Sequence, residues 1–154
     1  MDESDLYDEP ILARARTVPR LGRLAAPDIS VERVSRVCGS RVTVDLKVDG
    51  GRVVDFAQAV DACALGKASA AILGSAIIGC SAGDIRDAVQ RLRAMLRHRA
   101  PAPGGRWADL GILAPVADIP TRHASVLLPF EAAEEALARL DAQATGTTSQ
   151  TAAG

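Results

Sequence analysis

Aromatic side chains and net charge are both scarce in this sequence. Aromatic residues make up 3% of the 154 residues, so we expect a core built from valine, leucine, isoleucine and alanine. Because the formal net charge is -1, no overall field draws the chain to nucleic acid or to an anionic membrane. The arginines of residues 86–99 have no aromatic residues between them, which argues against a surface that stacks nucleic-acid bases. We therefore expect no nucleic-acid partner and no membrane partner.

Long apolar runs and an export signal are also missing. No stretch reaches the roughly 18–20 apolar residues that span a bilayer. The sequence opens with the acidic run Met1-Asp2-Glu3-Ser4-Asp5, which is unlike a secretory signal. Its 3 cysteines are an odd number, and this argues against a disulfide framework. We expect a cytoplasmic protein whose thiols stay reduced and available to bind a metal.

The clearest local pattern in the chain predicts β-strands. Hydrophobic and polar residues alternate over residues 41–49, as in a strand that is buried on one face. Asp49-Gly50-Gly51 is typical of a hairpin turn, so a return strand is expected over residues 52–60. Residues 31–37 could form an edge strand. Together these segments predict a three-stranded antiparallel sheet.

Helical periodicity and capping residues predict four helices around these strands. The expected helices cover residues 4–16, 64–78, 82–98 and 129–142. Ser81 followed by Asp84 is the capping pattern that starts the third of them. A helix, then strands, then helices is typical of the α+β class, with the helices packed against the sheet. We expect one domain over residues 1–142 and a disordered C-terminal tail over residues 143–154, where small polar residues dominate.

Two cysteines and one histidine lie at the borders of these predicted elements. Cys38 precedes the alternating strand, and Cys63 opens the helix of residues 64–78. His123 comes shortly before the last helix. Side chains from distant segments can meet where strands and helices end, and thiolate and neutral imidazole both bind soft metals. This arrangement indicates a metal site or an iron–sulfur site.

The same residues also have other interpretations. An unpaired cysteine is often a buried small apolar side chain, and this is the reading we favour for Cys80. Cys63 could instead be an enzyme nucleophile activated by His123, although no oxyanion-hole motif and no acid to orient the imidazole is apparent. Lys67, four residues after Cys63, could favour the thiolate through its charge, or could be an ordinary surface lysine.

One ordered set of segments spans nearly the whole chain. Its core runs from Val37-Cys38-Gly39-Ser40 to Val48, passes through Gly50-Gly51 and ends with Cys63-Ala64-Leu65-Gly66-Lys67. The flanking segments are Leu6-Tyr7-Asp8 with Ile11-Leu12, Pro19 to Leu24, and Arg122 to Leu127. Over roughly residues 5–140 this set resembles the IscU/SufU/NifU N-terminal family of iron–sulfur cluster assembly scaffolds. The resemblance implies a three-stranded antiparallel sheet covered by helices, in agreement with the pattern above.

The resemblance also implies a site. In that family three cysteines and an aspartate hold a nascent 2Fe-2S cluster, or zinc in some members, and a histidine can precede the third cysteine. Cys38 and Cys63 match two of those cysteines, while Ser40 stands in the place of the aspartate. A gapless match puts His123 on the histidine and Ala124 on the third cysteine, whereas a shifted match puts His123 in the place of that cysteine. The third thiol is absent in either match.

The resemblance therefore implies a scaffold or carrier, not an enzyme, that works with a cysteine desulfurase and with proteins that accept clusters. It would bind a labile iron–sulfur cluster, iron or zinc through Cys38, Cys63 and His123, with Ser40 and Lys67 as accessory residues. Two thiolates and an imidazole cannot close a tetrahedral site, so we expect the site to be partly open. Because a cysteine and the aspartate are missing, a zinc-bound or metal-free paralogue that docks on the same partners is the alternative.

Overall fold

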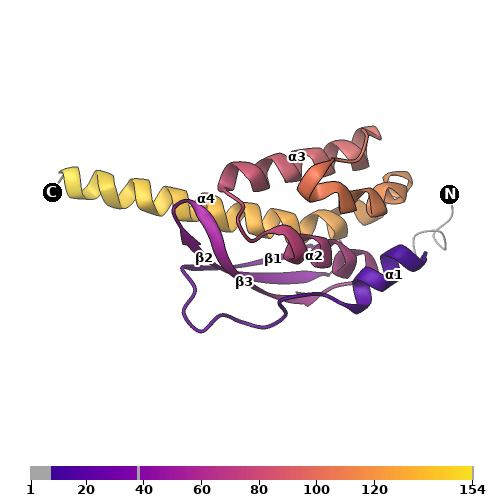
Figure 1. Ribbon diagram of the computed structural model, residues 1–154, viewed down its shortest axis with the longest axis horizontal. Coiled ribbons are helices and arrows are strands. Elements are labelled where there is room, and N and C mark those ends of the chain that lie inside the picture. Colours follow the sequence, from indigo (N-terminus) through magenta and orange to yellow (C-terminus); the bar gives the residue numbers. More distant parts are fainter. Residues whose placement is uncertain (1–7, 38, 154) are drawn as a thin grey trace.

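Three strands form an antiparallel sheet with β2 at its centre (Figure 1). The structure is a computed structural model that describes residues 8–37 and 39–153, with side chains up to residue 143. Its strands are β1 (Ile29–Val34), β2 (Arg41–Asp49) and β3 (Arg52–Asp61). The predicted three-stranded antiparallel sheet is confirmed, although β1 lies slightly earlier in the chain than residues 31–37.

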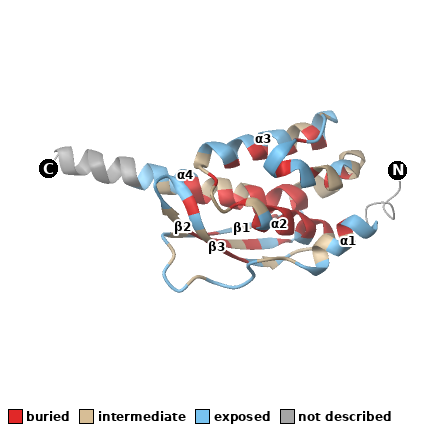
Figure 2. Cartoon of the chain, viewed as in Figure 1, coloured by how far each residue is buried: buried red, intermediate tan, exposed pale blue. Residues whose placement is uncertain are grey.

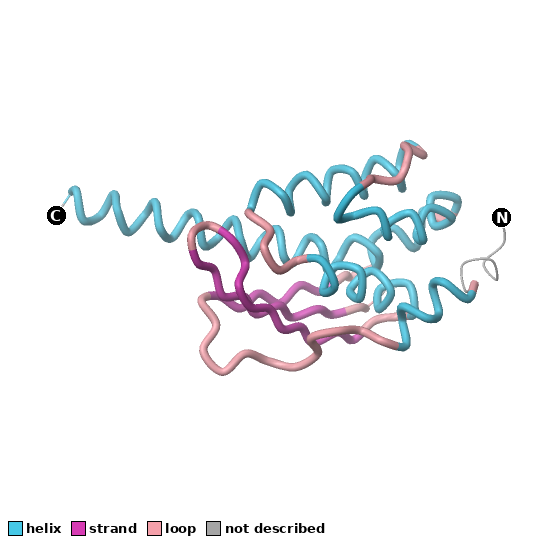
Figure 3. Tube along the Cα trace, viewed as in Figure 1, coloured by secondary structure: helices cyan, strands magenta, loops and turns pink. Residues whose placement is uncertain are grey.

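Helices form the second layer of the molecule. They are α1 (Glu9–Arg16), α2 (Ala64–Ala76), α3 (Ala82–His98) and α4 (His123–Ala153), together with the 3₁₀ segments η2 (Gly105–Asp118) and η3 (Pro120–Arg122). α2 and α4 pack on the sheet and on each other, and α3 packs on α4 (Figure 1). The loop between α1 and β1 runs along the side of the sheet away from α3 and α4 (Figure 3). The predicted α+β class is therefore confirmed.

Buried residues lie in both the sheet and the helices (Figure 2), and most of the core that they form is aliphatic. Val44 of β2, Leu73 of α2 and Leu92 of α3 are fully buried in this core. Its aromatic members are Phe56 of β3 and an edge-to-face pair, Trp107 and Phe130, with ring centroids 5.5 Å apart. Burial of this apolar surface is the main favourable term for folding. The core thus has the composition that the scarcity of aromatic residues predicts.

α4 begins earlier than the sequence pattern predicts. The spacing of apolar residues from Phe130 to Leu140 predicts a helix over residues 129–142, and a proline inside a helix leaves the carbonyl four residues earlier without its usual N–H partner. In the structure, α4 begins at His123 and holds Pro129 at a buried position within the helix. The Ser69 hydroxyl of α2 donates a hydrogen bond to the Val126 carbonyl, at 2.5 Å. Packing against α2 therefore supports the part of α4 that contains the proline.

The two ends of the chain differ from the prediction in their helix bounds. α1 begins at Glu9 with Asp8 as its N-cap, and the N-terminal part of the predicted helix lies outside the described residues. α4 continues to Ala153, beyond the predicted end at residue 142. The division into a domain of residues 1–142 and a disordered tail of residues 143–154 stays a prediction.

Candidate functional site

A pocket of about 220 Å³ lies where three distant segments of the chain meet. Its walls come from the start of β2, from the junction between β3 and α2, and from the end of η3. The lining residues are Gly39, Ser40, Asp61, Ala62, Cys63 and Arg122. Two of the residues singled out in the sequence, Ser40 and Cys63, therefore share one pocket.

Strand pairing brings the first two of these segments together. Arg41 and Asp61 are partners at the end of the β2–β3 ladder, so the residues just outside that pair lie side by side. The turn before β2 is closed by a hydrogen bond from the Ser35 N–H to the Ser40 carbonyl, at 2.8 Å. Gly39 in this turn has φ +73, a left-handed conformation that favours glycine. The same turn leaves the Ser40 side chain almost completely buried, with 4% of the residue exposed.

Cys63 occupies the N-cap position of α2 and is half-buried. Its Sγ lies 3.2 Å from the Oγ of Ser125 in the first turns of α4. α2 and α4 approach closely here because residue 66 is glycine. A β-carbon at Gly66 would lie 2.8 Å from the Cβ of Ala62 and 2.9 Å from the Ser125 Oγ. The helix packing thus seats the cysteine thiol against a buried hydroxyl that the sequence motifs did not single out.

His123 is the first residue of α4, and it is not among the residues that line the pocket. Its Nε2 lies 2.9 Å from the Val116 carbonyl oxygen of η2, so this nitrogen is the donor in the neutral tautomer that fits the contact. The Nδ1 is then the nitrogen with a lone pair. This is the arrangement of many metal-binding histidines, in which one ring nitrogen is held by a carbonyl and the other binds the metal.

Two other predicted site residues stand apart from this pocket. Cys38 lies outside the described residues, so its role as a ligand stays a prediction. Lys67 is exposed and lines a different pocket, together with Arg16 and Leu21. Its predicted influence on Cys63 also stays a prediction. Within residues 8–37 and 39–153, no group of three histidine, cysteine or acidic residues forms a metal site.

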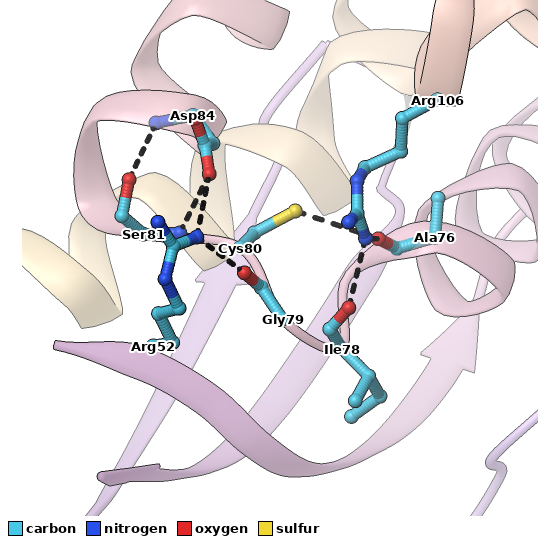
Figure 4. Close-up of polar contacts among 8 residues, drawn as sticks. All are labelled: Arg52, Ala76, Ile78, Gly79, Cys80, Ser81, Asp84 and Arg106. Carbon is cyan, nitrogen blue, oxygen red and sulfur yellow. Dashed lines mark hydrogen bonds and ion pairs between the residues drawn. The ribbon is translucent and has the colours of Figure 1, made fainter. Parts of the chain in front are cut away.

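Cys80 is the buried cysteine between α2 and α3, and Figure 4 shows its surroundings. Its Sγ lies 3.4 Å from the Ala76 carbonyl oxygen, to which Arg106 also donates a hydrogen bond. Burial raises the pKa of the Cys80 thiol, and the positive charge of Arg106 opposes this rise only in part. A neutral thiol in this position is a structural group, as the sequence reading favoured.

Asp61 and Arg122 are pocket residues that the sequence reasoning did not name. Asp61 ends β3 and Arg122 ends η3, so both sit at element borders like the three residues that it did name. Their position at the ends of these elements is the feature of the sequence that could have indicated a site. Because charged residues at strand and helix ends are also common on ordinary surfaces, this feature does not distinguish Asp61 and Arg122 from other Asp and Arg residues.

Comparisons with known proteins agree with this architecture. One similar solved structure is the crystal structure of a nitrogen-fixing NifU-like protein (N-terminal) from Brucella abortus. Its sequence is 42% identical to this chain, and the two structures superpose with a TM-score of 0.87 over 90% of this chain and 96% of that chain. The iron-sulfur cluster assembly scaffold protein IscU of Thermotoga maritima is 25% identical over 135 residues, which are 88% of this chain and 94% of that protein.

A more distant structure has the same fold. The putative iron-sulfur cluster assembly scaffold protein for the SUF system from Fervidobacterium islandicum AW-1 is 22% identical, with a TM-score of 0.81 over 88% of this chain and 99% of that chain. A scan against protein-family models found no match. The identity to the Brucella abortus protein over almost the entire length of both chains is nevertheless decisive, and this chain belongs to the IscU/NifU-like family.

Proposed function

We propose that this chain is a scaffold or carrier in iron–sulfur cluster assembly and that it holds its cargo at the pocket beside Cys63. The observation that carries the proposal is a half-buried thiol at a helix N-cap, open to a pocket with a serine hydroxyl and a carboxylate. Sulfur and oxygen donors of this kind suit iron or zinc. The relatives from Thermotoga maritima and Fervidobacterium islandicum are named as cluster assembly scaffold proteins, which supports a role without catalytic turnover.

In this proposal Cys38 and Cys63 bind the metal as thiolates. Cys38 directly precedes Gly39, and Gly39 lines the same pocket as Cys63. The cargo is a labile 2Fe-2S cluster or iron, with zinc as the other candidate. Ser40 is the accessory oxygen donor, and its place on the pocket wall supports that role. When bound, the metal–sulfur unit carries the chemistry, while the protein supplies ligands and a partly shielded wall.

The proposed partners are a cysteine desulfurase that supplies sulfur and proteins that accept the finished cluster. The scaffold relatives support such partners in general terms, since a scaffold needs a source and a destination for its cluster. Among the described residues, no helix combines the length and the apolar character that crossing a membrane requires. The cytoplasmic location stays a prediction.

His123 is the proposed imidazole ligand, acting through Nδ1 while Nε2 is held by the Val116 carbonyl. We expect His123→Ala to lower zinc affinity by roughly tenfold or more, because both the donor and its orienting contact are lost. Competition with a chromophoric chelator measures this affinity. His98→Ala is the matched control, since His98 is exposed near the end of α3 and away from the pocket. Equal affinities for both variants and the wild type would remove His123 from the ligand set.

The test of the function is anaerobic reconstitution of the full chain with ferrous iron, sulfide and dithiothreitol. We expect a visible chromophore with stoichiometric iron and sulfide, and transfer of that cluster to an apo-ferredoxin. The Cys38→Ala/Cys63→Ala double variant should form neither. If the wild type takes up zinc tightly but forms no cluster, the chain is the zinc-bound paralogue. Failure to bind either cargo would reject the pocket as a cluster site.

A further inference from the structure

We infer that the carboxylate of Asp61 is an oxygen ligand for the metal or cluster held at Cys63. The inference rests on the proposed function and adds a residue to its ligand set. Of the described residues that line the pocket, Asp61 alone carries a carboxylate. Carboxylate oxygen binds both zinc and iron, so it can fill a position that two thiolates and an imidazole leave open.

The backbone places Asp61 on the same wall as the thiol. Asp61 is the last residue of β3, and Cys63 follows two residues later with φ -68 and ψ 174, an extended conformation. Only Ala62 separates the two residues in the chain. Both residues line the pocket of about 220 Å³. A strand end followed directly by a helix cap thus presents a carboxylate and a thiol together.

The Asp61 carboxylate has no partner among the described residues. It is exposed, and it makes no side-chain hydrogen bond or ion pair there. Asp55, on the same strand, instead forms an ion pair with Arg20. Arg41 lies directly opposite Asp61 in the sheet register, yet the two do not form an ion pair. An unpaired carboxylate beside a thiol keeps its oxygens available for a cation.

The charge of the pocket also fits such a ligand. A dipositive zinc ion or cluster core neutralises the charge of two thiolates, and Asp61 adds one further negative charge. Arg122 also lines this pocket and contributes one positive charge to it. Opposite charges at close range stabilise each other most strongly where water is partly excluded.

The test compares Asp61→Asn with Asp49→Asn in the full chain. Both changes remove one negative charge at an exposed aspartate, but Asp49 lies at the opposite end of β2, beside the hairpin. We expect Asp61→Asn to weaken zinc binding by about 10- to 100-fold in a chelator competition, the range seen when a group that supports a metal site is lost. Asp49→Asn should bind zinc like the wild type. The visible spectrum of bound Co²⁺ should change for Asp61→Asn alone.

Salt and a conservative variant separate ligation from a general charge effect. At about 1 M salt the Debye length is about 3 Å, so a long-range effect of charge disappears and the loss of a ligand persists. Asp61→Glu keeps a carboxylate and should recover part of the affinity that Asp61→Asn loses. Because Asp61 is exposed and unpaired, both variants should have the thermal melting curve of the metal-free wild type.

Each outcome distinguishes the inference from the function on which it rests. If Asp61→Asn binds zinc like the wild type while Cys63→Ala loses it, Asp61 is not a ligand and the scaffold proposal stands. If Asp61→Asn and Asp49→Asn weaken binding equally, the effect is electrostatic and the inference is wrong. If the wild type binds neither zinc nor a cluster, the proposed function fails together with the inference.

Discussion

Cys63→Ala is expected to abolish cluster formation and to lower zinc affinity at least about tenfold. Among the described residues, Cys63 is the cysteine that lines the pocket, and alanine has no sulfur atom that could bind a metal in its place. Anaerobic reconstitution followed by iron and sulfide analysis measures the first effect, and chelator competition measures the second. Since Cys63 has no side-chain hydrogen bond to the α2 backbone, the substitution should leave the helix cap intact.

Cys80→Ala is the matched control for this experiment. It also removes one thiol, but Cys80 is fully buried between α2 and α3 and is not a pocket residue (Figure 4). We expect this variant to form the same amount of cluster as the wild type. A loss of less than tenfold in zinc affinity for Cys63→Ala, or an equal loss for Cys80→Ala, would count strongly against Cys63 as the principal ligand.

Asp45→Ala should lower the free energy of unfolding by about 3 kcal/mol, because hydrogen bonds to a buried charged group are among the strongest in proteins. The Asp45 side chain is only 1% exposed on β2. It accepts hydrogen bonds from the Arg23 guanidinium at 2.7 Å, the Leu24 N–H at 3.0 Å and the Ser30 hydroxyl at 2.6 Å. These bonds fasten the loop before β1 to the sheet. Urea denaturation of both proteins measures the difference.

The same carboxylate gives the stability a defined pH dependence. Burial by itself would raise the pKa of Asp45, but the hydrogen bonds from Arg23, Ser30 and Leu24 outweigh it, and the pKa is lowered in the folded protein. The unfolded chain therefore binds the proton more readily, with a pKa of about 3.9. The stabilisation is complete above that pH and is lost as the pH falls through the lower, folded-state pKa.

Asp45→Asn provides the control for this titration, because it keeps the shape of the side chain and cannot ionise. Its deficit in stability relative to the wild type should be constant near neutral pH and should shrink in acid, below a pH of about 3.9. A deficit that stays the same down to acid-induced unfolding would show that the charge of Asp45 contributes nothing. Urea titrations at a series of pH values give this comparison.

The sheet could be predicted because its signals are local. Alternation over residues 41–49 and the Gly50-Gly51 hairpin depend on neighbouring residues alone, and the structure has the same strand at the same residues. The start of α4 could not be predicted in this way. The apolar spacing from Phe130 onward predicts a helix that begins at residue 129, whereas contact with α2 supports a helix that begins at His123.

The candidate site was predictable for a similar reason, and only in part. Ser40 and Cys63 stand at element borders in the sequence, and the structure places both on one pocket. Asp61 lies only two residues before Cys63, whereas Ser125 reaches Cys63 through the α2–α4 contact. That contact arises between segments that are distant in sequence, so no local pattern encodes it. The hydrogen bond of His123 to η2 depends on such packing as well.

The residues that line the pocket come from the sheet, from the start of α2 and from the end of η3, so a ligand in the pocket would contact all of these parts. In the proposed function, a bound cluster or cation would act as a reversible cross-link between the two layers. Binding to the folded chain alone raises its stability by RT ln(1 + [L]/Kd), which makes loading and unfolding coupled equilibria. Proteases that attack transiently opened chains would then remove empty scaffold before loaded scaffold. In that way the supply of iron and sulfide would also set the lifetime of the protein.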